Sequence, residues 1–199
     1  MKYKKRLLIT CRDPSTANVV NMLFKARMIS KFTIFILVQR PASKIINIEY
    51  SKYCNEIKNY NNKQLYKITT AHVNYFQPDL ILSGISGPGS GIDEIATKIA
   101  FRLKILHFSL QLFWGDYNKT IRKYYSNFIV FDNFAKKNTH KFFKSQKIYV
   151  VGNINYEKKI YVRKSNHNSQ LKILILGQPF EEKRKYLNFI KKLILRLKE

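Results

Sequence analysis

The sequence predicts an α/β protein with a Rossmann-like, doubly wound parallel sheet over residues 1–155. Short apolar runs show no alternation of polar and apolar residues, which indicates strands buried on both faces. Longer amphipathic segments separate these runs, as helices do that cover both faces of a parallel sheet. Hydrophobic residues make up 45% of the 199 residues, so the chain is large and apolar enough to bury a core.

The first half of this domain is expected to begin with a buried strand at 6–10 (RLLIT). The turn CRDPSTAN follows, and Ser15 or Thr16 is the predicted N-cap of a helix that runs to about residue 28. The later segments are predicted to be a strand at 33–38, a helix within 45–60, a short strand at 65–68 and a helix at 70–76.

The second half contains the clearest unit, a strand at 80–84, a glycine-rich loop and a helix at 92–103. The helical period predicts one apolar face on this helix, made of Ile92, Ile95, Ala96, Ile99 and Leu103. The segments that complete the domain are predicted strands at 105–110, 128–131 and 147–151 and a helix at 133–143.

The C-terminal part has a different character. Residues 156–170 are polar and resemble a linker, and residues 171–199 predict one buried strand followed by an amphipathic helix. One strand and one helix cannot bury their apolar faces alone, so they either complete the first sheet or begin a second Rossmann-like domain whose remainder is missing. We favour the truncated second domain, because a polar linker followed by a new buried strand is typical of the start of another domain.

The net charge of +25 and the pI near 10.1 first suggest an anionic partner. However, the chain has 28 Lys and only 9 Arg, and Arg is the residue that reads phosphates and bases bidentately. Lys, Asn, Ile, Tyr and Phe also share A/T-rich codons, so genome composition explains much of this bias. We therefore do not expect nucleic acid as a partner, whereas contact with an anionic membrane surface stays open as an alternative.

The number of cysteines, the spacing of the histidines and the length of the apolar runs exclude several further classes of protein. Cys11 and Cys54 cannot build a disulfide scaffold or a cysteine zinc site, and the four His show no metal-ligand spacing, so we predict no metal. His107 is expected to be a core histidine within a strand. The N-terminal apolar run is too short for a signal peptide and no run approaches a membrane span, so we expect a cytoplasmic protein, with peripheral contact to the inner membrane as the alternative.

The loop GISGPGSG lies between a buried strand and a helix, where open α/β sheets bind ligands. Glycine permits positive φ and close approach of the backbone, and the next helix N-terminus offers N–H groups to an anion or hydroxyl. The alternative is a tight strand–helix connection. The ligand-loop interpretation assigns substrate binding to Gly84, Ser86, Gly87, Gly89, Ser90 and Gly91.

Standard nucleotide motifs are absent from this loop. It has no Lys for a P-loop, and it does not meet the spacing of a dinucleotide fingerprint or a nucleophile elbow. We therefore predict no cofactor.

Carboxylates follow two of the predicted strands. Asp93 and Glu94 occupy the first turn of the helix after the loop, where they either complement the helix dipole or bind sugar hydroxyls and act as a base. Asp13 and Ser15 lie in the first strand–helix turn and should face the same crevice. Glu94 and Asp13 are our candidate catalytic bases, and Ser15 is either a substrate contact or a helix cap.

The segment LQLFWGDYN combines an amide, aromatic rings and a carboxylate after a strand end. Aromatic faces beside such groups suit carbohydrates, so Gln111, Trp114 and Asp116 are predicted substrate-binding residues. The alternative for Trp114 is that it anchors a surface loop in the core.

The order of segments from Asp79 to Gly152 resembles the N-terminal half of GT-B-type glycosyltransferases and of UDP-N-acetylglucosamine 2-epimerase-like proteins linked to bacterial surface polysaccharides. The resemblance covers about three quarters of the chain. Two departures are Gln111, where such proteins often have an acid, and Asn153-Ile154, where Gly-x-Pro is usual. The positions that carry the resemblance are Gly84, Ser86, Glu94, Gln111, Trp114, Asp132, Gly152 and Asn153.

The resemblance implies the acceptor-side domain of a sugar transferase, with a nucleotide-sugar donor and a carbohydrate or lipid-linked acceptor. The donor site of such proteins lies mainly in their C-terminal domain, which 171–199 would represent only in part. Activity of this chain alone should then be weak or absent. The alternatives are a UDP-N-acetylglucosamine 2-epimerase-like enzyme, and a non-catalytic basic module for anionic membrane or nucleic acid.

Overall fold

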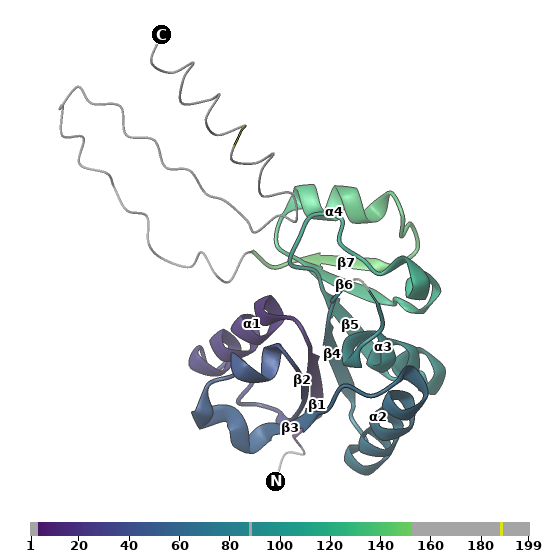
Figure 1. Cartoon of the computed structure of the whole chain (residues 1–199). Coiled ribbons are helices and arrows are strands. Elements are labelled where there is room, and N and C mark those ends of the chain that lie inside the picture. Colours follow the sequence, from purple (N-terminus) through teal and green to yellow (C-terminus); the bar gives the residue numbers. More distant parts are fainter. Residues whose placement is uncertain (1–3, 88, 153–187, 189–199) are drawn as a thin grey trace, which may run out of the picture. The chain divides into compact units, whose positions relative to one another are not determined.

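Seven parallel strands form one sheet in the order β3-β2-β1-β4-β5-β6-β7 (Figure 1). This computed structural model describes residues 4–87, 89–152 and 188. The predicted Rossmann-like parallel sheet is therefore confirmed. The strands are β1 (Arg6–Cys11), β2 (Thr33–Gln39), β3 (Cys54–Ile57), β4 (Leu80–Gly84), β5 (Leu106–Leu110), β6 (Asn127–Val130) and β7 (Lys147–Val150).

Helices cover both faces of the sheet, as a doubly wound fold requires. In Figure 1, α1 lies on one side of the strands and α2 and α3 lie on the other. The α-helices are α1 (Pro14–Lys25), α2 (Asn62–Phe76), α3 (Ile92–Leu103) and α4 (Asn133–His140). Three 3-10 helices complete the connections, η1 (Ala42–Lys44), η2 (Ile48–Tyr53) and η3 (Lys119–Tyr124).

The strand order reverses at β1. The chain leaves β1 for β2 and β3 on one side and returns to β4 on the other side, so β1 and β4 are neighbours although they are far apart in sequence. Loops that leave β1 and β4 diverge to opposite faces, and this opens a crevice at the carboxyl ends of the strands. The predicted glycine-rich loop follows β4 and therefore borders this crevice.

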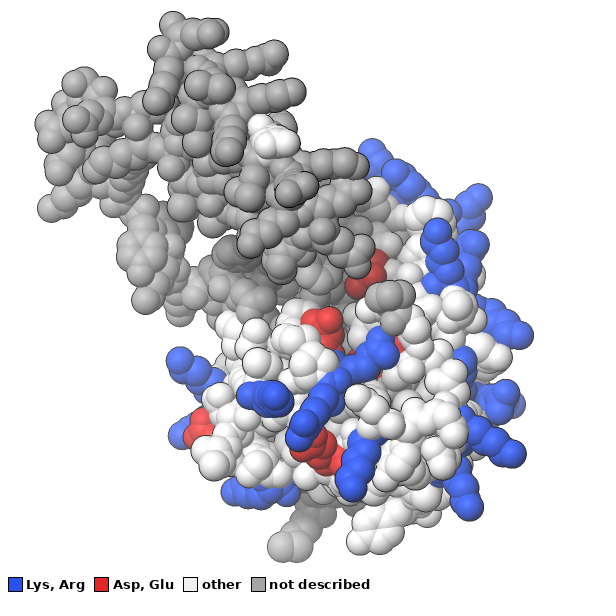
Figure 2. Space-filling view, viewed as in Figure 1, with Lys and Arg blue, Asp and Glu red and all other residues white. Residues whose placement is uncertain are grey.

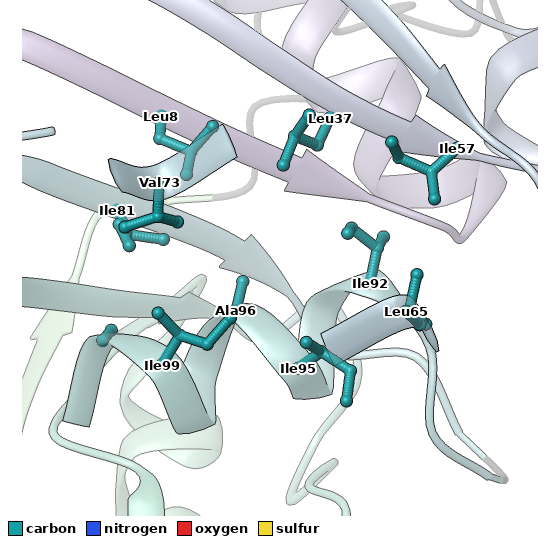
Figure 3. Packing of buried hydrophobic residues seen from close by; sticks show 11 residues of the cluster. Leu8, Leu37, Ile57, Leu65, Val73, Ile81, Ile92, Ile95, Ala96 and Ile99 are labelled. Atoms are coloured by element: carbon teal, nitrogen blue, oxygen red, sulfur yellow. The ribbon is translucent and has the colours of Figure 1, made fainter. Parts of the chain in front are cut away.

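The largest apolar cluster fills the space between the sheet and the helices α2 and α3 (Figure 3). Leu8, Leu37 and Ile81 point from neighbouring strands toward Val73 and Ile99 on the helices. A second cluster packs β1 and β2 against α1, and a third, rich in aromatic rings, joins β6 to η3 and α4. Both faces of the sheet near the crevice are thus held rigidly, which fixes the loops that leave it.

Helix α3 begins and ends where the sequence predicts, but its apolar face is shorter than expected. Ile92, Ile95, Ala96 and Ile99 are buried, whereas Leu103 is 49% exposed. Leu103 is the last residue of the helix, beyond the part that packs against the sheet.

Two other helix boundaries need correction. The N-cap of α1 is Asp13, whose carboxylate accepts from the backbone N–H of Ser15, and Pro14 takes the first helical position. The prediction of Ser15 or Thr16 as the cap was therefore wrong. Helix α4 ends at His140, before the predicted residue 143.

The segment between β2 and β4 was predicted least well. Residues 45–60 contain η2 and the short strand β3 instead of one helix. The predicted strand at 65–68 lies inside α2, where Leu65, Thr69 and Val73 face the core at helical spacing. The predicted linker 156–170 and second unit 171–199 lie outside the described residues, apart from Asn188.

The described helices include none that combines the length and apolar character needed to cross a bilayer.

Candidate functional site

A polar cavity of about 470 Å³ lies at the carboxyl ends of the first four strands of the sheet. The loops that leave β1, β2, β3 and β4 all contribute to its wall. Its lining residues are Arg12, Asp13, Gln39, Arg40, Pro41, Asn59, Tyr60, Ser86, Gly87 and Ser90. The site therefore lies in the crevice where a ligand was predicted.

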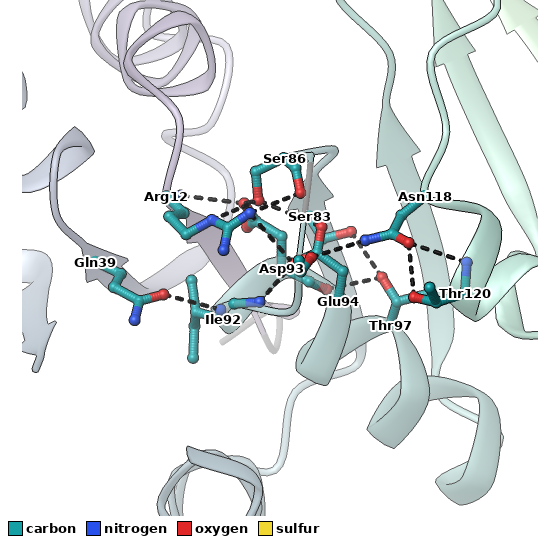
Figure 4. Close-up of polar contacts among 12 residues, drawn as sticks. Arg12, Gln39, Ser83, Ser86, Ile92, Asp93, Glu94, Thr97, Asn118 and Thr120 are labelled. Carbon is teal, nitrogen blue, oxygen red and sulfur yellow. Dashed lines mark hydrogen bonds and ion pairs between the residues drawn. The ribbon is translucent and has the colours of Figure 1, made fainter. Parts of the chain in front are cut away.

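Arg12 lies across the floor of this cavity and was not among the predicted residues. Its Nε donates to Ser86 Oγ at 3.0 Å and its Nη2 donates to the Ser86 carbonyl at 2.8 Å (Figure 4). Nη2 also lies 4.0 Å from Glu94 Oε2. A Cβ at Gly91 would come within 2.5 Å of Arg12 Cδ, so glycine at this position gives the arginine its room. In the sequence, only the position of Arg12 just after the first predicted strand indicates that it borders the site.

Asp93 lies beneath Arg12 and faces the protein interior. Its carboxylate accepts from Thr10 Oγ1 at 2.8 Å, from the Arg12 backbone N–H at 3.1 Å and from Ser86 Oγ at 3.0 Å. Burial raises the pKa of Asp93, and the hydrogen bonds from Thr10 and Ser86 oppose that shift. This side chain ties β1 to the glycine-rich loop and to α3.

Glu94 is buried beside Asp93. Its Oε2 accepts from the Gly91 backbone N–H at 2.7 Å, so the Glu94 side chain satisfies the N–H of the N-cap residue of α3. Burial, and then the negative charge of Asp93, raise the pKa of Glu94. The carboxylate is screened from the cavity by Arg12 and Ser86, so a role as base stays a prediction that requires Arg12 to move.

The first N–H groups of α3 are occupied within the protein. Gly91 N–H donates to Glu94, and Ile92 N–H donates to Gln39 Oε1 at 3.1 Å. Two of the N–H groups at this helix start are therefore not free, and the offer of N–H groups to an anion or hydroxyl stays a prediction for the rest of the first turn. Gln39 also donates from Nε2 to Asn59 Oδ1 at 2.9 Å, which links the loops after β2 and β3.

The glycines of the loop have different roles. A Cβ at Gly84 would lie 2.6 Å from Thr16 Oγ1, so this glycine permits close packing against α1. Gly89 has a φ of +97°, a conformation that favours glycine. Gly87 and Ser90 line the cavity.

Asp13 is the carboxylate on the cavity wall. It accepts from the backbone N–H of Ser15 at 2.9 Å and from the Ser15 hydroxyl, so Ser15 positions this carboxylate. Burial, and then the negative charge of Asp13, raise the pKa of Asp116. Asp116 is not among the described residues that line the cavity.

The loop after β5 is held by its buried amide. Gln111 Nε2 donates to the Asp116 carbonyl at 2.8 Å, and Gln111 Oε1 accepts from Thr139 Oγ1 at 3.0 Å. Both ends of this side chain are satisfied by the protein, so it supports the loop and faces away from the cavity. Its assignment as a substrate contact stays a prediction that would require these bonds to break.

Trp114 is 60% exposed, so the alternative of a buried core anchor is wrong. Its Nε1 donates to Asp132 Oδ2 at 3.0 Å, and its ring packs at 5.8 Å against Phe134. The ring is thus fixed in orientation and open to solvent. Asp132 is in turn the N-cap of α4.

Asn118 is a second residue that the sequence analysis missed. Its Nδ2 donates to the Gly89 carbonyl at 2.8 Å and its Oδ1 caps η3 through the Thr120 backbone N–H. It joins the glycine-rich loop to the loop after β5. No pattern around Asn118 predicts this, because the two residues lie 29 positions apart.

His107 is buried in β5, as predicted. Its Nε2 lies 2.8 Å from Ser83 Oγ, and burial lowers the pKa of the ring to about 3. In the part of the chain that the structure describes, no three His, Cys, Asp or Glu side chains are grouped so that they could hold a metal ion.

Comparison with known proteins identifies relatives by structure alone. No family model and no curated protein sequence matches this chain. A UDP-GlcNAc 2-epimerase from Methanocaldococcus jannaschii superposes with a TM-score of 0.55 and 17% identity over 75% of this chain. The enzyme from Neisseria meningitidis, solved with bound UDP-GlcNAc, gives a TM-score of 0.56 and 15% identity, also over 75%.

The fold is that of these epimerases. It is a GT-B-like, Rossmann-type α/β fold, and the likeness extends over most of the described sheet and helices. The chain spans less than half of their length, 45% of the first and 46% of the second. The activity and substrates of the whole enzymes are therefore not carried over to this chain by fold.

Proposed function

We propose that this chain is one half of a nucleotide-sugar enzyme, and that the cavity at the carboxyl edge holds the sugar substrate. The observation that supports it most is the make-up of the cavity wall. Arg12 and Arg40, which pair with Glu94 at 4.0 Å and with Glu56 at 3.1 Å, have further guanidinium N–H groups for a diphosphate. Asn59, Tyr60 and Ser90 supply amide and hydroxyl groups for sugar hydroxyls. The neighbour solved with UDP-GlcNAc makes this nucleotide sugar the first ligand to test.

The reaction we favour is glycosyl transfer to an acceptor held in this half, such as a carbohydrate or a lipid-linked sugar of surface polysaccharide synthesis. Asp13 is the base in this proposal, because it is the carboxylate that lines the cavity. It would take the proton of an acceptor hydroxyl while that oxygen attacks the anomeric carbon and the nucleoside diphosphate leaves. The second half of such an enzyme supplies most of the donor site, so the chain alone should bind weakly and turn over slowly or not at all.

Epimerisation of UDP-GlcNAc is the second candidate, and the structural neighbours favour it directly. The products separate the two candidates. A new glycoside together with free UDP indicates transfer, whereas N-acetylmannosamine, either still linked to UDP or released by water together with UDP, indicates epimerisation. Both candidates would use the same cavity, but transfer replaces the bond between the anomeric carbon and the diphosphate, whereas epimerisation inverts the configuration at C2.

Chemical-shift mapping with UDP-GlcNAc on the 199-residue chain tests the proposal. We expect the largest shifts at the backbone amides of Gly87 and Ser90, and weaker binding for Arg40→Gln. Lys67→Gln, an exposed change on α2, is the matched control and should bind as the wild type does. Shifts confined to other surfaces, or equal loss in both variants, would refute the assignment of this cavity.

Two substitutions separate the proposed role of Asp13 as a base from its role as the N-cap of α1. Asparagine is as good an N-cap as aspartate, so Asp13→Asn should keep the stability of α1 and remove the base. Asp13→Ala should also lose about 1 kcal/mol of stability through the lost cap. If any turnover is measured and Asp13→Asn retains it fully, Asp13 is not the base.

A further inference from the structure

A second cavity, of about 570 Å³, lies between η3 and the turn that follows α4. It is separate from the carboxyl-edge cavity and shares no lining residue with it. Five of its lining side chains are cationic, and none of the described residues that line it is acidic. The lining residues are Lys119, Thr120, Arg122, Lys123, Lys141, Phe142, Phe143, Lys144, Ser145 and Gln146. We call this the basic cavity.

The positive charge of the basic cavity is not neutralised by the protein around it. The ion pairs found among the described residues involve Arg12 and Arg40, and neither lies here. From residue 117 to residue 152 the sole acid in the sequence is Asp132. That carboxylate caps the opposite end of α4, where it accepts from Trp114 and from the Ala135 backbone N–H.

Arg122 is held in place within this cavity. Its Nη2 donates to the Phe142 carbonyl at 2.7 Å, and its guanidinium lies 5.8 Å from the centre of the Phe143 ring. These contacts fix the arginine and leave its remaining N–H groups for a ligand. The lysines around it are exposed and supply charge without a fixed geometry.

Exposed aromatic rings continue from the basic cavity along α4. Phe142 is 43% exposed and packs against Tyr117 at 5.3 Å. At the other end of the helix, Trp114 and Phe134 are 60% and 58% exposed and pack edge to face. Figure 2 shows Lys and Arg side chains along the right-hand side of the molecule, from the level of α4 and β7 down to that of α3 and α2.

We propose that this surface docks on an anionic lipid bilayer, with lipid phosphates in the basic cavity and the exposed ring of Phe142 at the level of the headgroups. Cationic side chains are attracted to anionic lipid without any precise geometry, and aromatic side chains favour the membrane interface. The contact is peripheral, through a surface of the folded domain. It does not depend on the proposed sugar chemistry, since it uses other residues.

Nucleic acid fits this surface less well. Four of the five cations are lysines, which act as point charges and do not read bases or phosphates bidentately. The rings pack against each other at interplanar angles of 43° for Tyr117–Phe142 and 87° for Trp114–Phe134. Stacking of successive bases needs open parallel faces, and these rings do not form such a series.

The test is sedimentation of the full chain with vesicles that contain phosphatidylglycerol, compared with pure phosphatidylcholine vesicles. We expect binding to the anionic vesicles alone, and release at high salt. The triple variant Lys119→Gln, Lys123→Gln and Lys144→Gln should weaken binding about fivefold for each lysine, or roughly a hundredfold in all.

The matched control removes the same charge elsewhere. Lys25→Gln, Lys63→Gln and Lys67→Gln change exposed lysines of α1 and α2, and we expect less than about a fivefold effect, because attraction fades within a Debye length. Equal loss in both triple variants would overturn the proposal, and so would equal binding to neutral vesicles. Displacement from vesicles by inorganic phosphate at constant ionic strength would assign the cavity to a soluble phosphate. Preferential binding of single-stranded RNA would assign it to nucleic acid.

Discussion

Asp93 joins three parts of the candidate site, so its replacement tests how the site is held. Its carboxylate accepts from Thr10 on β1, from the backbone after β1 and from Ser86 in the glycine-rich loop. Asp93→Ala removes the acceptor for all three donors at once. Asp93→Asn retains the shape of the side chain and removes the charge.

The expected size of the effect follows from these contacts. A buried donor left without its acceptor costs about 1–3 kcal/mol, and the three losses are not fully additive. Asp93→Ala also removes a carboxylate whose charged form is destabilised by burial, as its raised pKa indicates. This gain offsets part of the cost of the lost hydrogen bonds. We expect Asp93→Ala to lose about 3–5 kcal/mol of unfolding free energy, a large share of what a typical domain has.

The asparagine variant should be much milder. Its amide oxygen can still accept from the Arg12 backbone N–H and from Ser86, while the Thr10 hydroxyl can rotate to accept from the amide N–H. We expect a loss below about 1.5 kcal/mol. Urea unfolding followed by circular dichroism measures both, with Glu49→Ala on η2 as the exposed acidic control. If Asp93→Ala unfolds within about 1 kcal/mol of the wild type, or if the asparagine variant is equally damaged, the hydrogen-bond argument is refuted.

Three further predictions concern buried polar groups. Folding raises the pKa of Glu94 above its value in the unfolded chain, which is about 4.3. Protonated Glu94 therefore stabilises the folded state fully below that pH, and this contribution is lost as the pH rises through the folded-state pKa. Glu94→Gln should therefore lose less unfolding free energy between about pH 4 and pH 7 than the wild type, measured by urea unfolding at both values. His107, whose pKa is lowered to about 3 by burial, should show no ring titration by NMR from about pH 5 to pH 8, and a titrating ring would contradict its burial. Ser109 Oγ is buried and has no hydrogen-bond partner among the described residues, so Ser109→Ala should raise the thermal midpoint or leave it unchanged, and a clear fall would show that the hydroxyl is satisfied in solution.

Much of the fold could be predicted because its signals are local. The helix after the glycine-rich loop shows its apolar period in the sequence, and its start and end at Ile92 and Leu103 agree with the structure. The strand β3 is four residues long and contains one buried side chain, Ile57, so it carries no pattern that separates it from a helix. The start of α2 has a local cause, because the side chain of Asn61 is its N-cap and accepts from the Gln64 backbone N–H at 3.0 Å.

The place of the site could be predicted, but the direction of its side chains could not. Parallel strands end at one edge, so the loop after β4 had to lie there. Whether Asp93 and Glu94 face the cavity or the interior depends on Arg12 and Gln39, which lie in other loops. Contacts across 81 positions, such as Arg12 to Asp93, leave no trace in the local sequence. The same holds for the net charge, which the sequence gives as a total, whereas the structure shows that five of the cationic side chains line one cavity between η3 and the turn after α4.

At the carboxyl edge of the sheet, several polar side chains hold the loops in place, and others are left to line the cavity. Asp93 and Glu94 are committed to holding the loop, and Gln111 is committed to holding the chain after β5. What remains on the cavity wall is two guanidinium groups, amides, hydroxyls and the single carboxylate of Asp13, among the residues that the structure describes. Such a wall can orient a phosphorylated sugar, whereas one carboxylate cannot serve as both the acid and the base of a reaction that needs two. In the transfer that we propose, the diphosphate leaves as an anion, so Asp13 would act as the base and no second proton-transfer group would be needed.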